Sequence, residues 1–300
     1  MGFLPEAFSD YIAHGCRRAD FIQERLEQLG VKSERIVIDG KNHILVQFAS
    51  RAYNPQFKIK TVIAHYDRVP GSPGANDNSA ANWQIMDWAA RLKSYPSFHN
   101  VRIFFTDGEE LGWDTGVCGQ GAFGIASTFQ RLGITSDDVY VFDACGRGEI
   151  PILSRSGMNS PASSRFKLQF SDLHTRTQNL LRQATGGRWM TLPVPYSDNA
   201  SFLACGIPAV AITLLPADEA SLYARKINSD RHLEDAVVNR ESSKERRIKE
   251  HIPDFSYKEH LPLTWRLFHS ADDDIATLTP ASFSVMESVL NLIADAKVPC

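Results

Sequence analysis

Short apolar runs rich in β-branched and aromatic residues recur along the chain. Runs of this length, bounded by polar or turn residues, are typical of buried strands. They cover residues 60–64, 101–105, 139–142 and 209–214. Two segments flank an Asp-Gly pair within residues 35–48, which predicts a hairpin. Residues 166–170 alternate between apolar and polar positions, which indicates an edge strand.

Apolar positions three and four residues apart predict helices between these strands. One such stripe consists of Ile85, Trp88, Ala89 and Leu92. The same spacing predicts helices over residues 8–29 and 173–184 and a last helix that starts at Pro280. Helices that alternate with strands favour an α/β fold, in which helices cover both faces of a mostly parallel sheet. A chain of 300 residues can form such a fold as a single domain.

Acidic and histidine residues directly follow three of the predicted strands. His65 and Asp67 come after the first strand, Glu109 and Glu110 after the second, and Asp143 after the third. Open α/β sheets bind ligands outside the carboxyl ends of their strands. We therefore expect these side chains to meet in one site.

Two further residues extend this set. A loop containing Gly, Pro and Ser at residues 71–74 delivers Asp77 to the start of a helix, and His269 comes late in the chain. Zinc accepts imidazole nitrogen and carboxylate oxygen as ligands, and two zinc ions close together need a carboxylate between them. Asp67 can lie on the same strand face as His65 and fix its imidazole tautomer. The pattern predicts a two-metal hydrolytic site.

Each of these residues has a plainer interpretation when it is taken singly. A His-x-Asp pair often forms an ordinary hydrogen bond, and Asp77 in a Gly-, Asn- and Ser-rich stretch suits a helix cap. Glu109 and Glu110 suit a solvated turn. The spacing and order of all seven residues together favour the metal site.

The motifs, taken in order, resemble the zinc aminopeptidase family that includes the secreted bacterial leucine aminopeptidases and the glutamate carboxypeptidase II relatives. The matching motifs are His-Tyr-Asp at 65–67, Gly-Ala-Asn-Asp-Asn at 74–78, Asp-Gly-Glu-Glu-Leu-Gly at 107–112, Asp143, Ser-Asp-Asn-Ala at 197–200, Gly-Ile-Pro at 206–208, and His269 followed by Asp272. The resemblance implies a zinc-peptidase (phosphorylase/hydrolase-like) architecture.

The resemblance also implies two Zn²⁺ ions per chain. His65 and Asp143 would hold one ion, Glu110 and His269 would hold the other, and Asp77 would bridge them. Such a site would remove N-terminal residues from peptide or aminoacyl substrates.

The same family resemblance gives roles to three other carboxylates. Glu109 would be the general base that takes a proton from the attacking water. Asp67 would lie behind His65, and Asp198 in the Ser-Asp motif would support the site without binding metal.

Three departures from the family pattern keep alternatives open. Phe268 precedes the last histidine and cannot donate a hydrogen bond to an oxyanion, although Tyr196 could. Asp143 has an unusual continuation, Ala-Cys-Gly-Arg, and about forty extra residues precede His269.

Other activities are compatible with part of this residue set. Glutaminyl cyclases resemble this family in fold. Such an enzyme would bind one zinc through Asp77, Glu110 and His269, and the nearby Trp113 is compatible with that activity. A carboxypeptidase and a metal-free binding homologue are further alternatives. The full ligand set and Phe268 favour the aminopeptidase.

Composition excludes several other classes of protein. The net charge is −3 with no basic stripe, so we expect no nucleic-acid partner. No apolar stretch of about 20 residues predicts a membrane span. The start of the chain lacks a signal-peptide pattern, and five cysteines form no Cys-x-x-Cys motif, so we expect a cytoplasmic enzyme.

Two remaining features lie outside this pattern. Residues 217–260 are dense in charge and form an insertion, for which we weigh a solvated segment, a lid and an oligomer contact. Cys145 is expected to be a buried small residue rather than a nucleophile, and the Gly-Gln-Gly segment at 119–121 is expected to be a turn.

Overall fold

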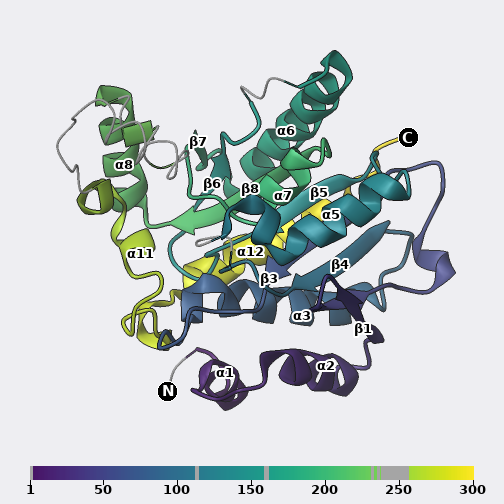
Figure 1. Cartoon of the computed structure of the whole chain (residues 1–300), viewed down its shortest axis with the longest axis horizontal. Coiled ribbons are helices and arrows are strands. Elements are labelled where there is room, and N and C mark those ends of the chain that lie inside the picture. Colours follow the sequence, from purple (N-terminus) through teal and green to yellow (C-terminus); the bar gives the residue numbers. More distant parts are fainter. Residues whose placement is uncertain (1–2, 112–114, 159–161, 231–232, 235–236, 238–256) are drawn as a thin grey trace.

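The described strands form one mixed sheet. The computed structural model describes residues 3–111, 115–158, 162–230, 233–234, 237 and 257–300. Within them the strand order is β1-β2-β4-β3-β5-β8-β6-β7 (Figure 1). The strands are β1 Ser33–Ile38, β2 Lys41–Val46, β3 Lys60–His65, β4 Val101–Thr106, β5 Asp138–Phe142, β6 Ile150–Ser154, β7 Met190–Leu192 and β8 Ala209–Leu215.

The centre of the sheet is parallel, and this decides where the site lies. β3 pairs in parallel with β4 and β5, and β5 pairs in parallel with β8. β2 and β6 join this centre as antiparallel neighbours of β4 and β8. Because β3, β4 and β5 run in the same direction, their carboxyl ends meet at one edge.

Helices cover both faces of the sheet (Figure 1). Residues on alternating positions of the strands pack into two separate apolar clusters, one on each face. One face carries α2 Arg18–Gln28, α3 Ala80–Leu92, α6 Ser164–Thr185 and α12 Pro280–Asp295, and α1 Glu6–Ile12 packs at its side. The other face carries α5 Gly121–Arg131 and α7 Asn199–Ala204.

A third apolar cluster lies where the chain leaves β8. It joins β6 to α8 Ala217–Ser229 and α11 Leu263–Arg266 through Tyr223, Ile227 and Trp265. Short helical turns complete the described elements, at η1 Ser50–Ala52, η2 Ala75–Ser79, η3 Val117–Gly119, η4 Tyr257–His260 and η5 Ile275–Thr277. The third cluster attaches α8, at the start of the charged insertion, and α11, just after the insertion, to the sheet.

The predicted edge strand at residues 166–170 is wrong, because this segment is the first part of α6. The Ser163 side chain accepts a hydrogen bond from the Phe166 backbone N–H at 3.3 Å and caps the helix. Phe166 and Phe170 are buried four residues apart, whereas Leu168 between them is 70% exposed. The pattern fits both periods over five residues, and only the following turns of the helix distinguish them.

The single helix expected over residues 8–29 is also wrong, since the structure has two helices there. α1 ends at Ile12 and α2 begins at Arg18, and Gly15 adopts a positive φ of 87° between them. The break allows the Arg18 guanidinium to turn inward and donate to the carbonyl oxygens of Tyr66, at 2.8 Å, and Pro73, at 3.0 Å.

The predicted hairpin and the four predicted apolar strands are confirmed. The hairpin turns at Asp39 and Gly40, which both have positive φ, as a two-residue turn of this type requires. Ile85, Trp88, Ala89 and Leu92 are buried in α3 as expected.

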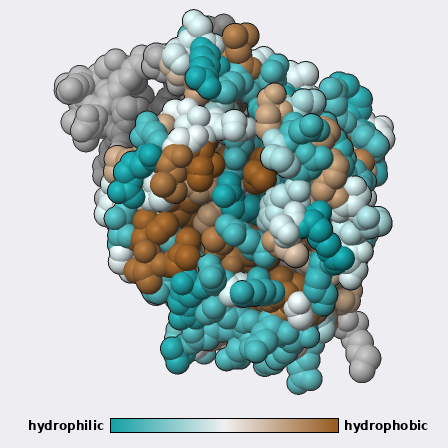
Figure 2. All heavy atoms as spheres, turned by 90° about the vertical axis from the view of Figure 1, so that its right-hand side faces the viewer, coloured by the Kyte–Doolittle hydropathy of each residue, from teal (hydrophilic) through white to brown (hydrophobic). Residues whose placement is uncertain are grey.

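Hydrophilic residues cover most of the face drawn in Figure 2. Figure 2 shows one area where apolar residues gather, on the side of the molecule that is at the right in Figure 1. Roughly half of any folded protein's surface is apolar, so this area by itself assigns no partner. Among the described residues, no helix has the length and apolar character needed to span a membrane.

Candidate metal centre

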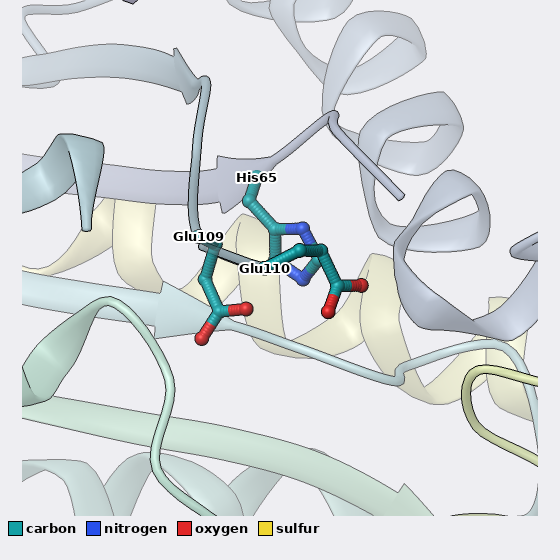
Figure 3. Close-up of side chains that lie close together, drawn as sticks. All are labelled: His65, Glu109 and Glu110. Carbon is teal, nitrogen blue, oxygen red and sulfur yellow. The ribbon is translucent and has the colours of Figure 1, made fainter. Parts of the chain in front are cut away.

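The parallel strands bring the predicted site residues to one edge of the sheet. His65 is the last residue of β3, Glu109 and Glu110 follow β4, and Asp143 follows β5. Figure 3 shows Glu109 and Glu110 close to the imidazole of His65. Asp77 and His269 reach the same edge from loops.

Two groups of side chains share Asp77. His65 Nε2 lies 3.3 Å from Asp77 Oδ1 and 3.6 Å from Asp143 Oδ1. His269 Nε2 lies 3.4 Å from Asp77 Oδ2 and 2.9 Å from Glu110 Oε2. In each group one ligand atom per residue lies within 4.8 Å of the others. The two carboxylate oxygens of Asp77 therefore face two different sets of ligand atoms.

Glu109 belongs to neither of these two groups, but it borders both. Its carboxylate lies within 4.8 Å of ligand atoms of His65 and Glu110. This position places a carboxylate beside the centre without making it a member of either ligand set.

Within the part of the chain that the structure describes, several buried nitrogen and oxygen atoms of this centre lack hydrogen-bond partners, as expected for atoms that could bind a cation. Among the described residues, both ring nitrogens of His65, Oε1 of Glu110 and Oδ1 of Asp143 are buried without a hydrogen-bond partner of normal geometry. Buried polar atoms nearly always have such partners. Imidazole nitrogen and carboxylate oxygen are the ligands that zinc accepts, so these residues fit a zinc ion.

The carboxylates of the centre destabilise one another's charge. Burial raises the pKa of Glu109 well above its usual range, and the neighbouring carboxylates of Glu110, Asp143 and Asp198 add to this rise. Burial also raises the pKa of Glu110 to about 7, with Asp77 acting in the same direction.

The two histidines respond in the opposite way. Burial alone would lower the pKa of His65, but the carboxylates of Asp143, Asp67 and Asp77 outweigh it and raise this pKa well above its usual value. The carboxylates of Asp77 and Glu110 likewise overcome burial and raise the pKa of His269 to about 10. The carboxylates at this edge of the sheet therefore stabilise a positive charge placed beside them.

Asp67 contacts more of the site than the sequence predicted. Its Oδ1 lies 3.5 Å from His65 Nδ1, so the two residues share a face of the strand end, and its role in orienting the imidazole stays a prediction. Its two oxygens also accept hydrogen bonds from the backbone N–H groups of Glu109, at 3.1 Å, and Glu110, at 3.0 Å. Asp67 thus holds two strand ends together.

The buried carboxylate after His269 is Asp273, not the Asp272 that matched the family motif. Asp272 is exposed, whereas Asp273 is buried and accepts hydrogen bonds from the backbone N–H groups of Asn76, at 2.8 Å, and Asp77, at 3.0 Å. Three consecutive aspartates at 272–274 gave no local signal to separate them.

The two asparagines beside Asp77 were also missed. Asn76 Oδ1 accepts from the Gly146 N–H at 2.7 Å, and Asn78 Oδ1 accepts from the Ala144 N–H at 3.2 Å. They tie the Asp77 turn to the loop that follows Asp143. A Gly-Ala-Asn-Asp-Asn motif was the only sequence signal for them.

The remaining candidates lie around this centre. Asp198 is buried and accepts a hydrogen bond from Thr106 Oγ1 at the end of β4, and burial raises its pKa to about 7. Cys145 is buried, and burial raises the pKa of its thiol well above its usual value, which suits a packing role. Tyr196 is 39% exposed. Trp113 lies outside the described residues.

Solved structures share this fold at low sequence identity. The LapA aminopeptidase of Legionella pneumophila is 14% identical over 96% of this chain and 69% of that chain, with a TM-score of 0.62. A Zn-dependent exopeptidase from Parabacteroides distasonis is 12% identical over 97% and 94%, with a TM-score of 0.61. A glutaminyl cyclase from an Acidobacteriales bacterium is 13% identical over 96% and 92%, with a TM-score of 0.58. The expected α/β fold is confirmed.

Sequence comparison identifies the family, which the shared fold alone does not. Aminopeptidase YwaD of Bacillus subtilis is 49% identical over 54 residues, which are 18% of this chain and 12% of that protein. The pattern of peptidase family M28 matches residues 51–293, which include all seven predicted site residues. The match covers well over half of the chain and confirms the resemblance found in its motifs. This chain belongs to peptidase family M28.

Proposed function

We propose that the chain is a zinc-dependent aminopeptidase that removes N-terminal residues from peptide or aminoacyl substrates. The observation that carries this proposal is the position of Asp77, which is shared by two ligand groups, with the Glu109 carboxylate beside them. A relative described as an aminopeptidase supports it.

Two zinc ions per chain suit these groups. His65 and Asp143 would hold one ion, Glu110 and His269 the other, and Asp77 would bridge them. Bound zinc would polarise the scissile carbonyl and lower the pKa of water to about 7.

Glu109 is the general base in this proposal. Its carboxylate would accept a proton from the attacking water and donate it to the departing amine. The acidic groups nearest the substrate, Glu109 and Asp143, would neutralise the positive amino terminus of the peptide. This charge pairing favours an aminopeptidase over a carboxypeptidase.

The second candidate is a glutaminyl cyclase with one zinc. The group of Asp77, Glu110 and His269 is by itself a set of three ligands with nitrogen and oxygen donors, which suffices for one catalytic zinc. In that case His65 and Asp143 would interact with each other rather than with a second ion.

Metal content and a substrate panel separate the two candidates. Protein loaded with excess zinc and then freed of unbound metal is expected to retain two ions per chain and to hydrolyse aminoacyl substrates. One ion per chain, together with cyclisation of N-terminal glutaminyl peptides, would establish the cyclase instead.

Two isosteric substitutions test the separate roles of the adjacent glutamates. Glu109→Gln keeps the side-chain shape but cannot accept a proton, so turnover is expected to fall by at least about 10²-fold with zinc content unchanged. Glu110→Gln is expected to weaken zinc binding. Full activity of Glu109→Gln would exclude Glu109 as the base.

A further inference from the structure

Gln120 contacts the proposed base directly. Its Nε2 donates a hydrogen bond to Glu109 Oε1 at 2.9 Å, and its Oε1 accepts one from the Ser201 hydroxyl at 2.8 Å. Gln120 is 5% exposed and Ser201 is fully buried. The three side chains form a short chain of hydrogen bonds that joins α7 to the loop after β4.

Gly121 explains why Gln120 lies beside this loop. The Gly121 N–H donates to the Gly108 carbonyl at 3.1 Å, and a Cβ at residue 121 would lie only 1.7 Å from the Asp107 carbonyl oxygen. Only glycine allows the first residue of α5 to approach the backbone that leads to Glu109 so closely. Gln120 immediately precedes it, so its side chain reaches Glu109.

The direction of the Gln120 amide follows from its two neighbours. A general base must be ionised to take up a proton, and an ionised carboxylate can only accept hydrogen bonds, so the amide NH₂ must face Glu109. The Ser201 hydroxyl can donate to the remaining amide oxygen, which holds the amide in this orientation. The carboxylate thus sets the direction of the amide, and Ser201 holds the far end of the amide in place.

We propose that Gln120 is a positioning residue for Glu109, an inference that rests on the proposed function. Asp67 holds the Glu109 backbone N–H, and Gln120 holds Oε1 of its side chain. Oε2 is left as the oxygen that exchanges the proton. A base held in this way needs no rotation before proton transfer, so Gln120 acts on turnover rather than on substrate binding.

Substitution of Gln120 separates the donor from the shape of the side chain. Gln120→Glu keeps the shape but places an oxygen against Glu109, and Gln120→Met removes the donor without adding charge. We expect kcat to fall at least about tenfold in both variants, KM to stay within about twofold, and zinc content to be unchanged. Gln130→Glu, at an exposed position of the same helix, is the matched control and is expected to behave like the original protein.

A double-substitution cycle distinguishes positioning from a structural role. If Gln120 acts through Glu109, Gln120→Met should cause no further loss of kcat in a Glu109→Gln background. Equal losses in both backgrounds, or kcat within twofold of the original in both Gln120 variants, would overturn the inference. Ser201→Ala leaves Gln120 in place and should give a smaller fall in kcat of the same kind, which keeps the test valid if Gln120→Met does not fold.

The same experiment separates this inference from the proposed function. If Glu109→Gln is inactive and the Gln120 variants are fully active, the proposed role of Gln120 is disproved and the proposed function stands. If Glu109→Gln is active, Glu109 is not the general base, and the proposed mechanism is disproved as well.

Discussion

Asp67 shows how one side chain can serve two parts of a site. Its carboxylate faces the imidazole of His65, and it also accepts the backbone N–H groups that present Glu109 and Glu110. The first contact was expected from the spacing of two residues on a strand. The second contact joins β3 to β4 and depends on the parallel pairing of these strands.

Asp67→Ala is expected to reduce zinc affinity or activity by roughly 10–100-fold, since it removes the carboxylate behind a zinc-binding histidine. Titration of zinc into the metal-free protein measures the affinity. Asp67→Asn keeps the shape and one acceptor, so its loss should be smaller. An effect within twofold in Asp67→Ala would show that this carboxylate orients nothing.

At the scale of elements, a partly buried ion pair anchors the charged insertion to the site. Arg147, four residues after Asp143, donates to Glu219 in α8 at 3.0 Å and to the Thr264 hydroxyl in α11 at 3.1 Å. Glu219 also accepts from the Thr264 backbone N–H at 2.8 Å. The first helix of the insertion, α8, and the helix that follows the insertion, α11, are therefore attached beside the loop of a proposed zinc ligand, and α11 leads directly to His269.

Arg147→Met is expected to lower the free energy of unfolding by about 1–3 kcal/mol, because it leaves the largely buried Glu219 carboxylate without its cation. It should also weaken zinc binding through His269. Urea unfolding and zinc titration measure these effects. Arg155→Met is the control, since Arg155 and Glu234 form a half-exposed pair at 3.6 Å that is worth about 0–1 kcal/mol. Equal losses in the two variants would contradict the anchoring role.

The role of residues 217–260, for which a solvated segment, a lid and an oligomer contact were weighed, stays open. α8 packs against β6 through Ala220, Tyr223 and Ile227, which makes it part of the body of the fold. Residues 238–256 lie outside the described residues, so the lid stays a prediction.

At the scale of the whole molecule, folding brings several carboxylates together against their mutual repulsion. A cation that binds the folded chain and not the unfolded chain stabilises the fold by mass action. We expect zinc at 100 times its dissociation constant to raise the free energy of unfolding by about 2.7 kcal/mol for each site. Urea unfolding with zinc and with a chelator measures this difference, and coincident curves would contradict it.

His99 gives the opposite end of the sheet its own dependence on pH. It is 1% exposed, and its Nδ1 accepts the Val101 backbone N–H at 3.1 Å. Burial lowers its pKa to about 4, and the nearby cations of Lys60 and Lys297 act in the same direction. As pH falls from 6.5 to 4, the unfolded chain binds a proton that the folded chain does not, so stability is lost over this window.

His99→Gln should therefore flatten the acid side of the stability curve, because glutamine keeps an acceptor but does not titrate. The difference between the two proteins should grow by up to about 3 kcal/mol between pH 7 and pH 4. Urea midpoints at pH 7, 6, 5 and 4 measure it. Parallel curves would show that His99 takes up its proton equally well in the folded state.

Hydrophobic patterning was sufficient for most of the sheet. Residues 60–64, 101–105, 139–142 and 209–214 are short, nearly continuous apolar runs, and buried parallel strands have this composition because both faces are covered. The pattern was insufficient at residues 166–170, where five residues fit either period. The pattern also did not predict the break before Arg18. This break lets Arg18 contact a loop that is distant in the sequence.

The sequence by itself predicted that His65, Glu109, Glu110 and Asp143 meet at the edge of the sheet, because side chains that follow neighbouring parallel strands end at the same edge. Asp77 and His269 lie on loops, and only the order of the motifs pointed to them. The sequence could not show that Gln120 would hold Glu109, that Asp273 rather than Asp272 would hold the Asp77 turn, or that Arg147 would join α8 to α11. Strand and helix patterns are local, whereas these contacts join residues that are far apart in the chain or lie on different elements. Only the packed sheet and its helices bring such partners within hydrogen-bond distance, and burial then makes each of those bonds necessary.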